Sequence, residues 1–101
     1  MWLFALFDLP VDKKEQRREY ARFRKKLLRE GFSMLQYSVY ARWYESEESC
    51  DTCKRFVRAN LPPEGQVRLL SVTDRQFEKM EIYIGISREP TEEPPVQIML
   101  F

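Results

Sequence analysis

Apolar residues recur along this chain with two periods, which predict strands and helices in alternation. Residues 2–8 form a short, aromatic-rich apolar run that is typical of a buried strand. Over residues 13–30 the apolar positions recur every three or four residues, which predicts a helix. We expect Asp12 and Glu15 to form a capping box at its start, and Gly31 to end it.

The same order of elements continues through the middle of the chain. Residues 32–44 are too long for one average strand, and a turn at 36–38 predicts a hairpin of two short strands. Ser46 is expected to cap a second helix over 47–60, and residues 67–73 have the β-branched, apolar composition of a strand. Strand, helix, strand, strand, helix, strand is the order of the ferredoxin-like α+β fold (βαββαβ), with both helices on one face of an antiparallel sheet.

The C-terminal part adds apolar residues that this small core does not require. Isoleucines alternate over residues 80–86, and a Pro-rich stretch at 90–95 precedes a last apolar run, 96–101. We expect 96–101 to be an extra strand that pairs across a protomer boundary, because a ferredoxin-like sheet leaves one face and two edges uncovered. The predicted organisation is a ferredoxin-like domain over 1–86, followed by a Pro-rich linker and C-terminal strand over 87–101.

Charge is unevenly divided along the chain, although the net charge is only +1. Residues 1–44 carry a net charge of +5 and residues 45–101 a net charge of −4. Five cations recur at helical spacing opposite the apolar face of the first helix, and we call them the basic ridge: Lys14, Arg18, Arg22, Lys25 and Arg29. A ridge of this kind favours binding to nucleic-acid phosphates by shape and charge. The alternative is a solvated helix face.

The residue types present exclude several kinds of catalytic and metal-binding site. The chain has no histidine, which excludes Ser-His-Asp and Cys-His catalysis and histidine-ligated zinc. Cys50 and Cys53 share a helix face with Val57, so we expect them to pack in the core; a labile dithiol or a pair shared across a dimer are the alternatives.

The opening apolar run is neither a signal peptide nor a membrane span, which favours a cytoplasmic protein without a membrane partner.

Asp8 is the candidate for chemistry, because it places a lone carboxylate where the first strand ends. One carboxylate per chain is too few for a two-carboxylate metal site, but the axis of a homodimer beside this strand end would supply a second copy. Two such carboxylates repel each other unless Mg²⁺ or Mn²⁺ neutralises them. The alternative is that Asp8 only ends the strand in an Asx-type turn before Leu9 and Pro10.

Four ordered motifs make the chain resemble a known family. They are Phe7-Asp8-Leu9-Pro10, Tyr20-x-x-Phe23-Arg24-Lys25, Gly31-Phe32-x-Met34-x-Gln36-x-Ser38-Val39-Tyr40 and Leu70-x-Val72-Thr73-Asp74-x-Gln76-Phe77. The set spans nearly the whole chain and resembles the small CRISPR-associated adaptation protein, which is the second of the two universal adaptation proteins and is commonly named an endoribonuclease. It is most similar to members found with single-effector, RNA-guided nuclease systems.

The resemblance implies an assembly and a site. It implies a homodimer flanked by two dimers of the CRISPR-associated integrase, with a prespacer duplex DNA lying across the basic surface. Asp8 of each protomer would face the dimer axis, where a divalent ion can bind. Arg17 matches a basic position near the active cleft and Ser38 matches the hairpin serine, which makes both candidate catalytic residues. Phe7 replaces the tyrosine that many members place before the aspartate.

Two function classes therefore stand open. One is a dimeric scaffold in spacer acquisition that bridges integrase subunits and binds duplex DNA. The other is a metal-dependent endonuclease that cleaves RNA or double-stranded DNA with Asp8 from both protomers. We favour the scaffold, because two carboxylates without a general base provide few of the groups that catalysis of hydrolysis requires.

Overall fold

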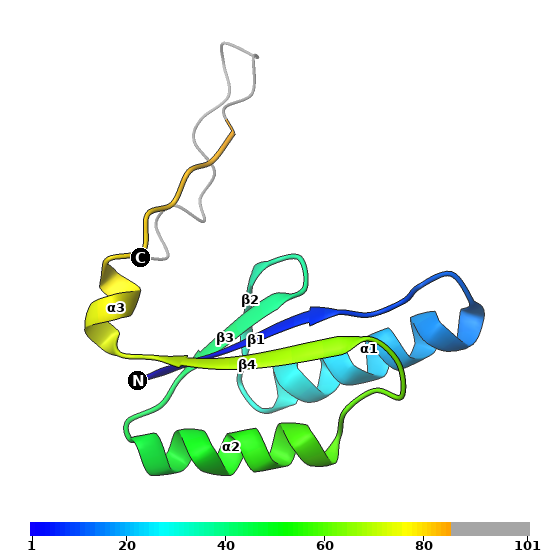
Figure 1. Ribbon diagram of the computed structural model, residues 1–101, viewed down its shortest axis with the longest axis horizontal. Helices are drawn as coiled ribbons and strands as arrows, with labels where there is room; N and C mark the ends of the chain where they lie inside the picture. The colour runs from blue at the N-terminus through cyan, green and yellow to red at the C-terminus, as the bar shows by residue number, and fades with distance from the viewer. Residues whose placement is uncertain (86–101) are drawn as a thin grey trace.

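The computed structural model describes residues 1–85, which form one four-stranded antiparallel sheet with two long helices packed on a single face (Figure 1). The elements in chain order are β1 Trp2–Asp8, α1 Lys14–Arg29, β2 Ser33–Gln36, β3 Val39–Trp43, α2 Glu47–Ala59, β4 Gln66–Val72 and α3 Asp74–Glu78. The strand order is β2-β3-β1-β4, so β1 is central and pairs with both β3 and β4. The predicted ferredoxin-like α+β fold is confirmed.

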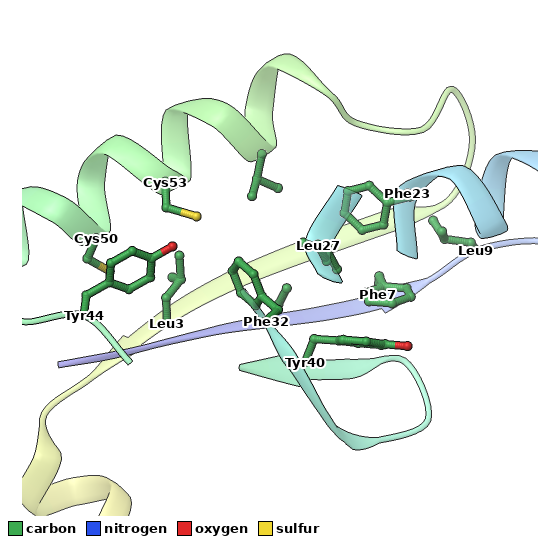
Figure 2. Close-up of a cluster of buried hydrophobic side chains, with 12 residues drawn as sticks. Leu3, Phe7, Leu9, Phe23, Leu27, Phe32, Tyr40, Tyr44, Cys50 and Cys53 are labelled. Carbon is green, nitrogen blue, oxygen red and sulfur yellow. The ribbon is translucent and has the colours of Figure 1, made fainter. Parts of the chain in front are cut away.

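The core lies between the sheet and the two long helices. Successive side chains of a strand point to opposite faces, so Leu3, Ala5 and Phe7 of β1 all point toward the helices and are buried. Figure 2 shows this layer meeting the inner faces of α1 and α2. The buried residues of the helices are Phe23, Leu27, Cys50, Cys53 and Val57. The prediction that both cysteines pack in the core as free thiols is confirmed.

The start of α1 differs from the expectation. Lys13, not Asp12, is the N-cap residue, and the Gln16 side chain accepts a hydrogen bond from the Lys13 backbone N–H at 2.9 Å. The predicted Asp12–Glu15 capping box is therefore wrong. The physical reason is local, because the Asp12 carbonyl accepts a hydrogen bond from the Arg17 side chain, five residues further on, and Asp12 is held in the preceding loop. At the other end Gly31, with φ of +92°, ends the helix as predicted.

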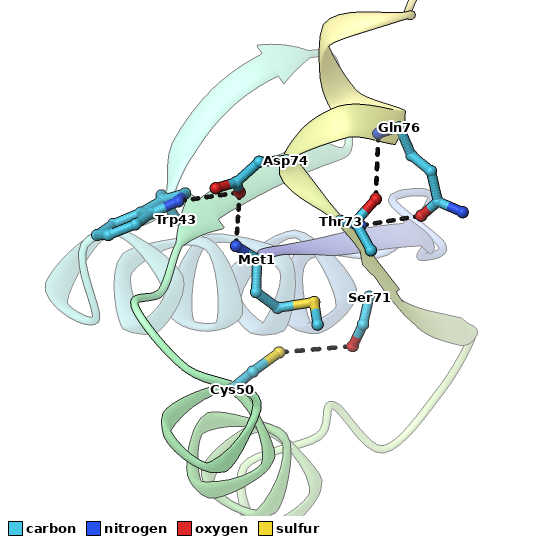
Figure 3. Close-up of polar contacts among 7 residues, drawn as sticks. All are labelled: Met1, Trp43, Cys50, Ser71, Thr73, Asp74 and Gln76. Carbon is cyan, nitrogen blue, oxygen red and sulfur yellow. Dashed lines mark hydrogen bonds and ion pairs between the residues drawn. The ribbon is translucent and has the colours of Figure 1, made fainter.

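Within residues 1–85, the sheet face opposite the two long helices is only partly covered. The short helix α3, which Figure 3 shows beside the N-terminus, lays Phe77 on Trp2, with ring centroids 4.0 Å apart and ring planes within 7° of parallel. Residues 80–85 continue past this face and form no strand within the described part of the chain, despite their alternating isoleucines. The predicted extra strand at 96–101 lies outside the described residues, as does the boundary at 86/87.

Stability is expected to fall at alkaline pH because of a buried pair in the core. Within residues 1–85, the Tyr44 hydroxyl is the one buried side-chain polar atom without a hydrogen bond of acceptable geometry. Burial, and then the neighbouring Cys53 thiol, raises the pKa of Tyr44, and burial also raises the pKa of Cys53. Both groups ionise more readily in the unfolded chain. Their contribution to stability is therefore complete below the ordinary pKa values, about 8.5 and 10, and is lost as the pH rises through the higher folded values.

Urea unfolding between about pH 8 and pH 11 measures this loss. The Tyr44→Phe variant removes one of the two groups and should show a flatter decline in the free energy of unfolding. An identical decline in the variant would assign the alkaline loss to other groups.

Candidate functional site

Asp8 is exposed at the last position of β1, directly after the buried Phe7. Its neighbour across the sheet is Gln66, the first residue of β4. The preceding Gly65 has φ of +91°, and a Cβ atom there would lie 2.5 Å from the Asp8 backbone oxygen. Only glycine permits this close approach, so Gly65 helps to position the strand end that carries the carboxylate.

The side chain of Asp8 makes no hydrogen bond or ion pair with any residue in the range 1–85. An Asx-type turn, in which this carboxylate would bind a nearby backbone N–H, is therefore not formed. Within this part of the chain, the carboxylate is left free to meet a ligand or a second subunit.

Ser38 lies next to this strand end, and its predicted catalytic role stays a prediction. The Phe7 N–H donates to the Ser38 backbone oxygen at 3.1 Å, which joins the β2–β3 turn to the end of β1. The Ser38 hydroxyl is within hydrogen-bond distance, 3.1 Å, of the Tyr20 hydroxyl on α1. Long-range pairing thus brings a hydroxyl from the hairpin and one from α1 beside the residue that precedes Asp8.

Arg17 holds the loop that follows Asp8. Its Nη1 atom donates to the backbone oxygens of Val11 and Asp12, at 2.9 and 3.0 Å. In this chain the guanidinium therefore positions the β1–α1 loop. A direct role of Arg17 in catalysis stays a prediction.

Residues 1–85 of one chain do not supply a complete metal site. No group of three or more acidic or cysteine side chains in residues 1–85 is arranged to hold a metal ion. The chemistry of an exposed carboxylate suits Mg²⁺ or Mn²⁺, which prefer oxygen ligands, and a second copy of Asp8 would raise the number of protein ligands.

The basic ridge faces solvent along α1, on the side away from Phe23 and Leu27. Four of its members are exposed: Lys14, Arg18, Lys25 and Arg29. The fifth, Arg22, is half-buried and forms an ion pair of 2.8 Å with Glu19. The ridge is therefore a continuous cationic surface with one partly neutralised position.

Sequence reasoning singled out Arg17 but missed the residues that accompany it on the side of α1 that faces the hairpin. Arg17, Tyr20 and Arg24 are spaced by three and four residues, which places them on one side of the helix. The Arg24 Nε atom donates to the Tyr40 hydroxyl at 2.8 Å, and the Tyr37 ring stacks against Tyr20. The helical spacing was a usable signal, but the stack joins α1 to the hairpin and depends on the fold.

The sheet face opposite the helices carries an apolar groove of about 560 Å³. Its lining residues include Phe4, Met34 and Val39 of the sheet and Ile82 and Tyr83 of the segment after α3. Leu70 on the same face is 52% exposed. Apolar surface of this kind is typical of a face that another chain covers. None of the helices in the described range has the length and apolar character needed to cross a membrane.

A ferredoxin-like subunit with a strand-end carboxylate and a cationic helix is the class of protein that this geometry defines. In comparisons with known proteins, the family "CRISPR associated protein Cas2" matches residues 1–80. The chain is 46% identical to the "CRISPR-associated endoribonuclease Cas2" of Parvibaculum lavamentivorans over 101 residues, which cover both proteins completely.

Two further relatives carry the same name. The Flavobacterium psychrophilum protein is 38% identical, with all of this chain and 88% of that protein covered. The Paracidovorax avenae protein is 42% identical, with all of this chain and 94% of that protein covered. This chain belongs to the CRISPR-associated Cas2 family.

Proposed function

We propose that this chain is a scaffold subunit in CRISPR adaptation, which dimerises, bridges integrase subunits and binds a prespacer duplex through the basic ridge. The solvent-facing ridge is the observation that carries the proposal. From Lys14 to Arg29 it extends about 22 Å along the helix axis, given a rise of about 1.5 Å per residue. Cations along such a length can follow the phosphates of a duplex without reading its bases.

Dimerisation is supported by the uncovered sheet face. Its groove and the exposed Leu70 would be removed from water by a second subunit. A dimer would also relate the two Asp8 carboxylates by symmetry if its axis passes beside the ends of the two β1 strands. The composition of the site favours a scaffold over an enzyme, because residues 1–85 of a single chain contribute one free carboxylate to it.

The scaffold function is tested by replacing two ridge arginines. The Arg18→Ala/Arg22→Ala double variant should bind duplex DNA more weakly, and the slope of log affinity against log salt should become shallower by about 0.9 for each phosphate that the variant no longer neutralises. The change should be the same for unrelated DNA sequences, and spacer integration with the cognate integrase should fall in parallel. Loss of Arg22 also leaves Glu19 unpaired, which adds to the loss of affinity.

A matched control removes two exposed arginines from α2 instead. The Arg55→Ala/Arg58→Ala variant loses the same charge but leaves the basic ridge intact, so its salt slope should remain that of the wild type. Equal slopes for the wild type and the Arg18→Ala/Arg22→Ala variant would show that the ridge is only a solvated face.

The second candidate function is a metal-dependent endonuclease acting on RNA or double-stranded DNA. It is favoured by the free carboxylate of Asp8 beside the Ser38 hairpin, and the relatives are named endoribonucleases. Asp8 from two protomers would hold the ion, and Arg17 would keep the loop after Asp8 in place. When bound, Mg²⁺ or Mn²⁺ would polarise the phosphodiester and lower the pKa of a water molecule.

A further inference from the structure

Tyr37 presents an ordered aromatic ring to solvent at the tip of the β2–β3 hairpin. Its side chain is 74% exposed, so the ring contributes little to the core. The ring nevertheless has a defined orientation, because it stacks on Tyr20 with centroids 5.9 Å apart and ring planes within 18° of parallel. Tyr20 in turn packs against the buried Phe7, with a centroid distance of 5.8 Å. Tyr20 covers the core, and Tyr37 lies outside it.

The backbone beside Tyr37 is held in an unfavourable conformation. Ser38 has φ of +63° and is the one non-glycine residue with positive φ in residues 1–85. A left-handed conformation costs a serine about 1 kcal/mol, which glycine would avoid. The Ser38 backbone oxygen accepts a hydrogen bond from the Phe7 N–H, and the Ser38 hydroxyl is hydrogen-bonded to the Tyr20 hydroxyl. Contacts to two other elements, β1 and α1, therefore hold the turn in this conformation. A strained backbone conformation that neighbouring contacts hold in place is typical of binding sites.

Positive charge lies on both sides of Tyr20 along α1. Arg17 precedes it by three residues and Arg24 follows it by four, so the two guanidiniums share its side of the helix. Both arginines are exposed. An aromatic surface flanked by two cations matches a nucleotide, whose base stacks and whose neighbouring phosphates are anionic.

We propose that Tyr37, supported by Tyr20, is a stacking platform for an unpaired nucleobase, with Arg17 and Arg24 beside its flanking phosphates. The inference rests on the proposed function in one respect, that the chain binds nucleic acid. The bases inside a duplex are already stacked, so the ligand is a single-stranded end or tail. The platform lies next to the strand end that carries Asp8, and an unpaired strand held there would pass close to the carboxylate.

The experiment uses the full chain and two probes, a blunt DNA duplex and the same duplex with a single-stranded tail containing 2-aminopurine. The Tyr37→Leu variant should bind the tailed duplex about tenfold more weakly than the wild type does, which is within the range for loss of one base–aromatic stack. It should bind the blunt duplex within about twofold of the wild type. Stacking in the wild type should quench 2-aminopurine fluorescence, and the quenching should be absent in the variant. An RNA tail in a parallel measurement shows which strand type the platform prefers.

Two variants serve as controls. Tyr37→Phe keeps the ring without its hydroxyl and should retain both the affinity and the quenching. Tyr83→Leu removes an aromatic side chain that is 85% exposed but takes no part in the Tyr20–Tyr37 stack, and should leave both probes unaffected. Thermal unfolding of each variant checks that an exposed substitution has not altered the fold.

Equal affinities of the wild type and Tyr37→Leu for the tailed duplex would overturn the proposal, as would an equal loss on both probes. A wild type that leaves 2-aminopurine fluorescence unquenched would do the same. These results are distinct from failure of the basic ridge. If the Arg18→Ala/Arg22→Ala variant shows a shallower salt slope while Tyr37→Leu behaves as the wild type does, duplex binding stands and the platform is wrong.

Discussion

The Asp8→Ala variant is expected to lose metal-stimulated cleavage of RNA or DNA by about 100-fold or more, while it keeps its dimerisation and its support of spacer integration. Asp8 is exposed at the end of β1, and its carboxylate has no partner in residues 1–85. Its removal therefore breaks no hydrogen bond or ion pair in the described fold. Only functions that need the carboxylate itself should change.

Three measurements separate the two proposed functions. Cleavage with Mg²⁺ or Mn²⁺, sedimentation, and integration with the cognate integrase are compared for the wild type, Asp8→Ala and Asp12→Ala. Asp12 is an exposed acid in the loop that follows Asp8, and α1 does not use it as a cap. Cleavage that persists in Asp8→Ala would contradict the nuclease assignment. Loss of integration in Asp8→Ala alone would contradict a scaffold that works without this carboxylate.

The Gly65→Ala variant is expected to destabilise the protein by about 3 kcal/mol, which corresponds to a fall in Tm of roughly 15 °C. Two costs combine. The φ of +91° is unfavourable for any residue with a Cβ atom, and that atom would lie 2.5 Å from the Asp8 backbone oxygen and 2.8 Å from the Leu9 side chain. A backbone oxygen in a central strand cannot move away as a flexible side chain can, so the strand end itself must shift.

The other two glycines provide a graded comparison by calorimetry or urea unfolding. Gly31→Ala places a Cβ atom 3.2 Å from the flexible Arg42 side chain at φ of +92°, and should cost about 1 kcal/mol. A Cβ atom at Gly85 meets no atom of residues 1–85 within 4 Å, so Gly85→Ala should change stability by less than about 0.5 kcal/mol. A Gly65→Ala protein as stable as Gly85→Ala would mean that the crowding against Asp8 relaxes at little cost.

Local periodicity determined the order and type of the elements in residues 1–85. The alternation of Leu3, Ala5 and Phe7 and the three- and four-residue spacing of the helix positions follow directly from strand and helix geometry. The same geometry put Cys50 and Cys53 in the core and the basic ridge on the opposite side of α1. These features were predictable because each depends on residues that are near one another in the chain.

The composition of the candidate site was decided by tertiary structure. Ser38 reaches the end of β1 only because β3 pairs with β1, and Tyr37 stacks on Tyr20 only because α1 packs beside the hairpin. Contacts across long sequence separations depend on strand register and helix packing, which no local pattern encodes. The sequence by itself thus determined which residues carry charge and which are buried, and the fold decided which of them meet at Asp8.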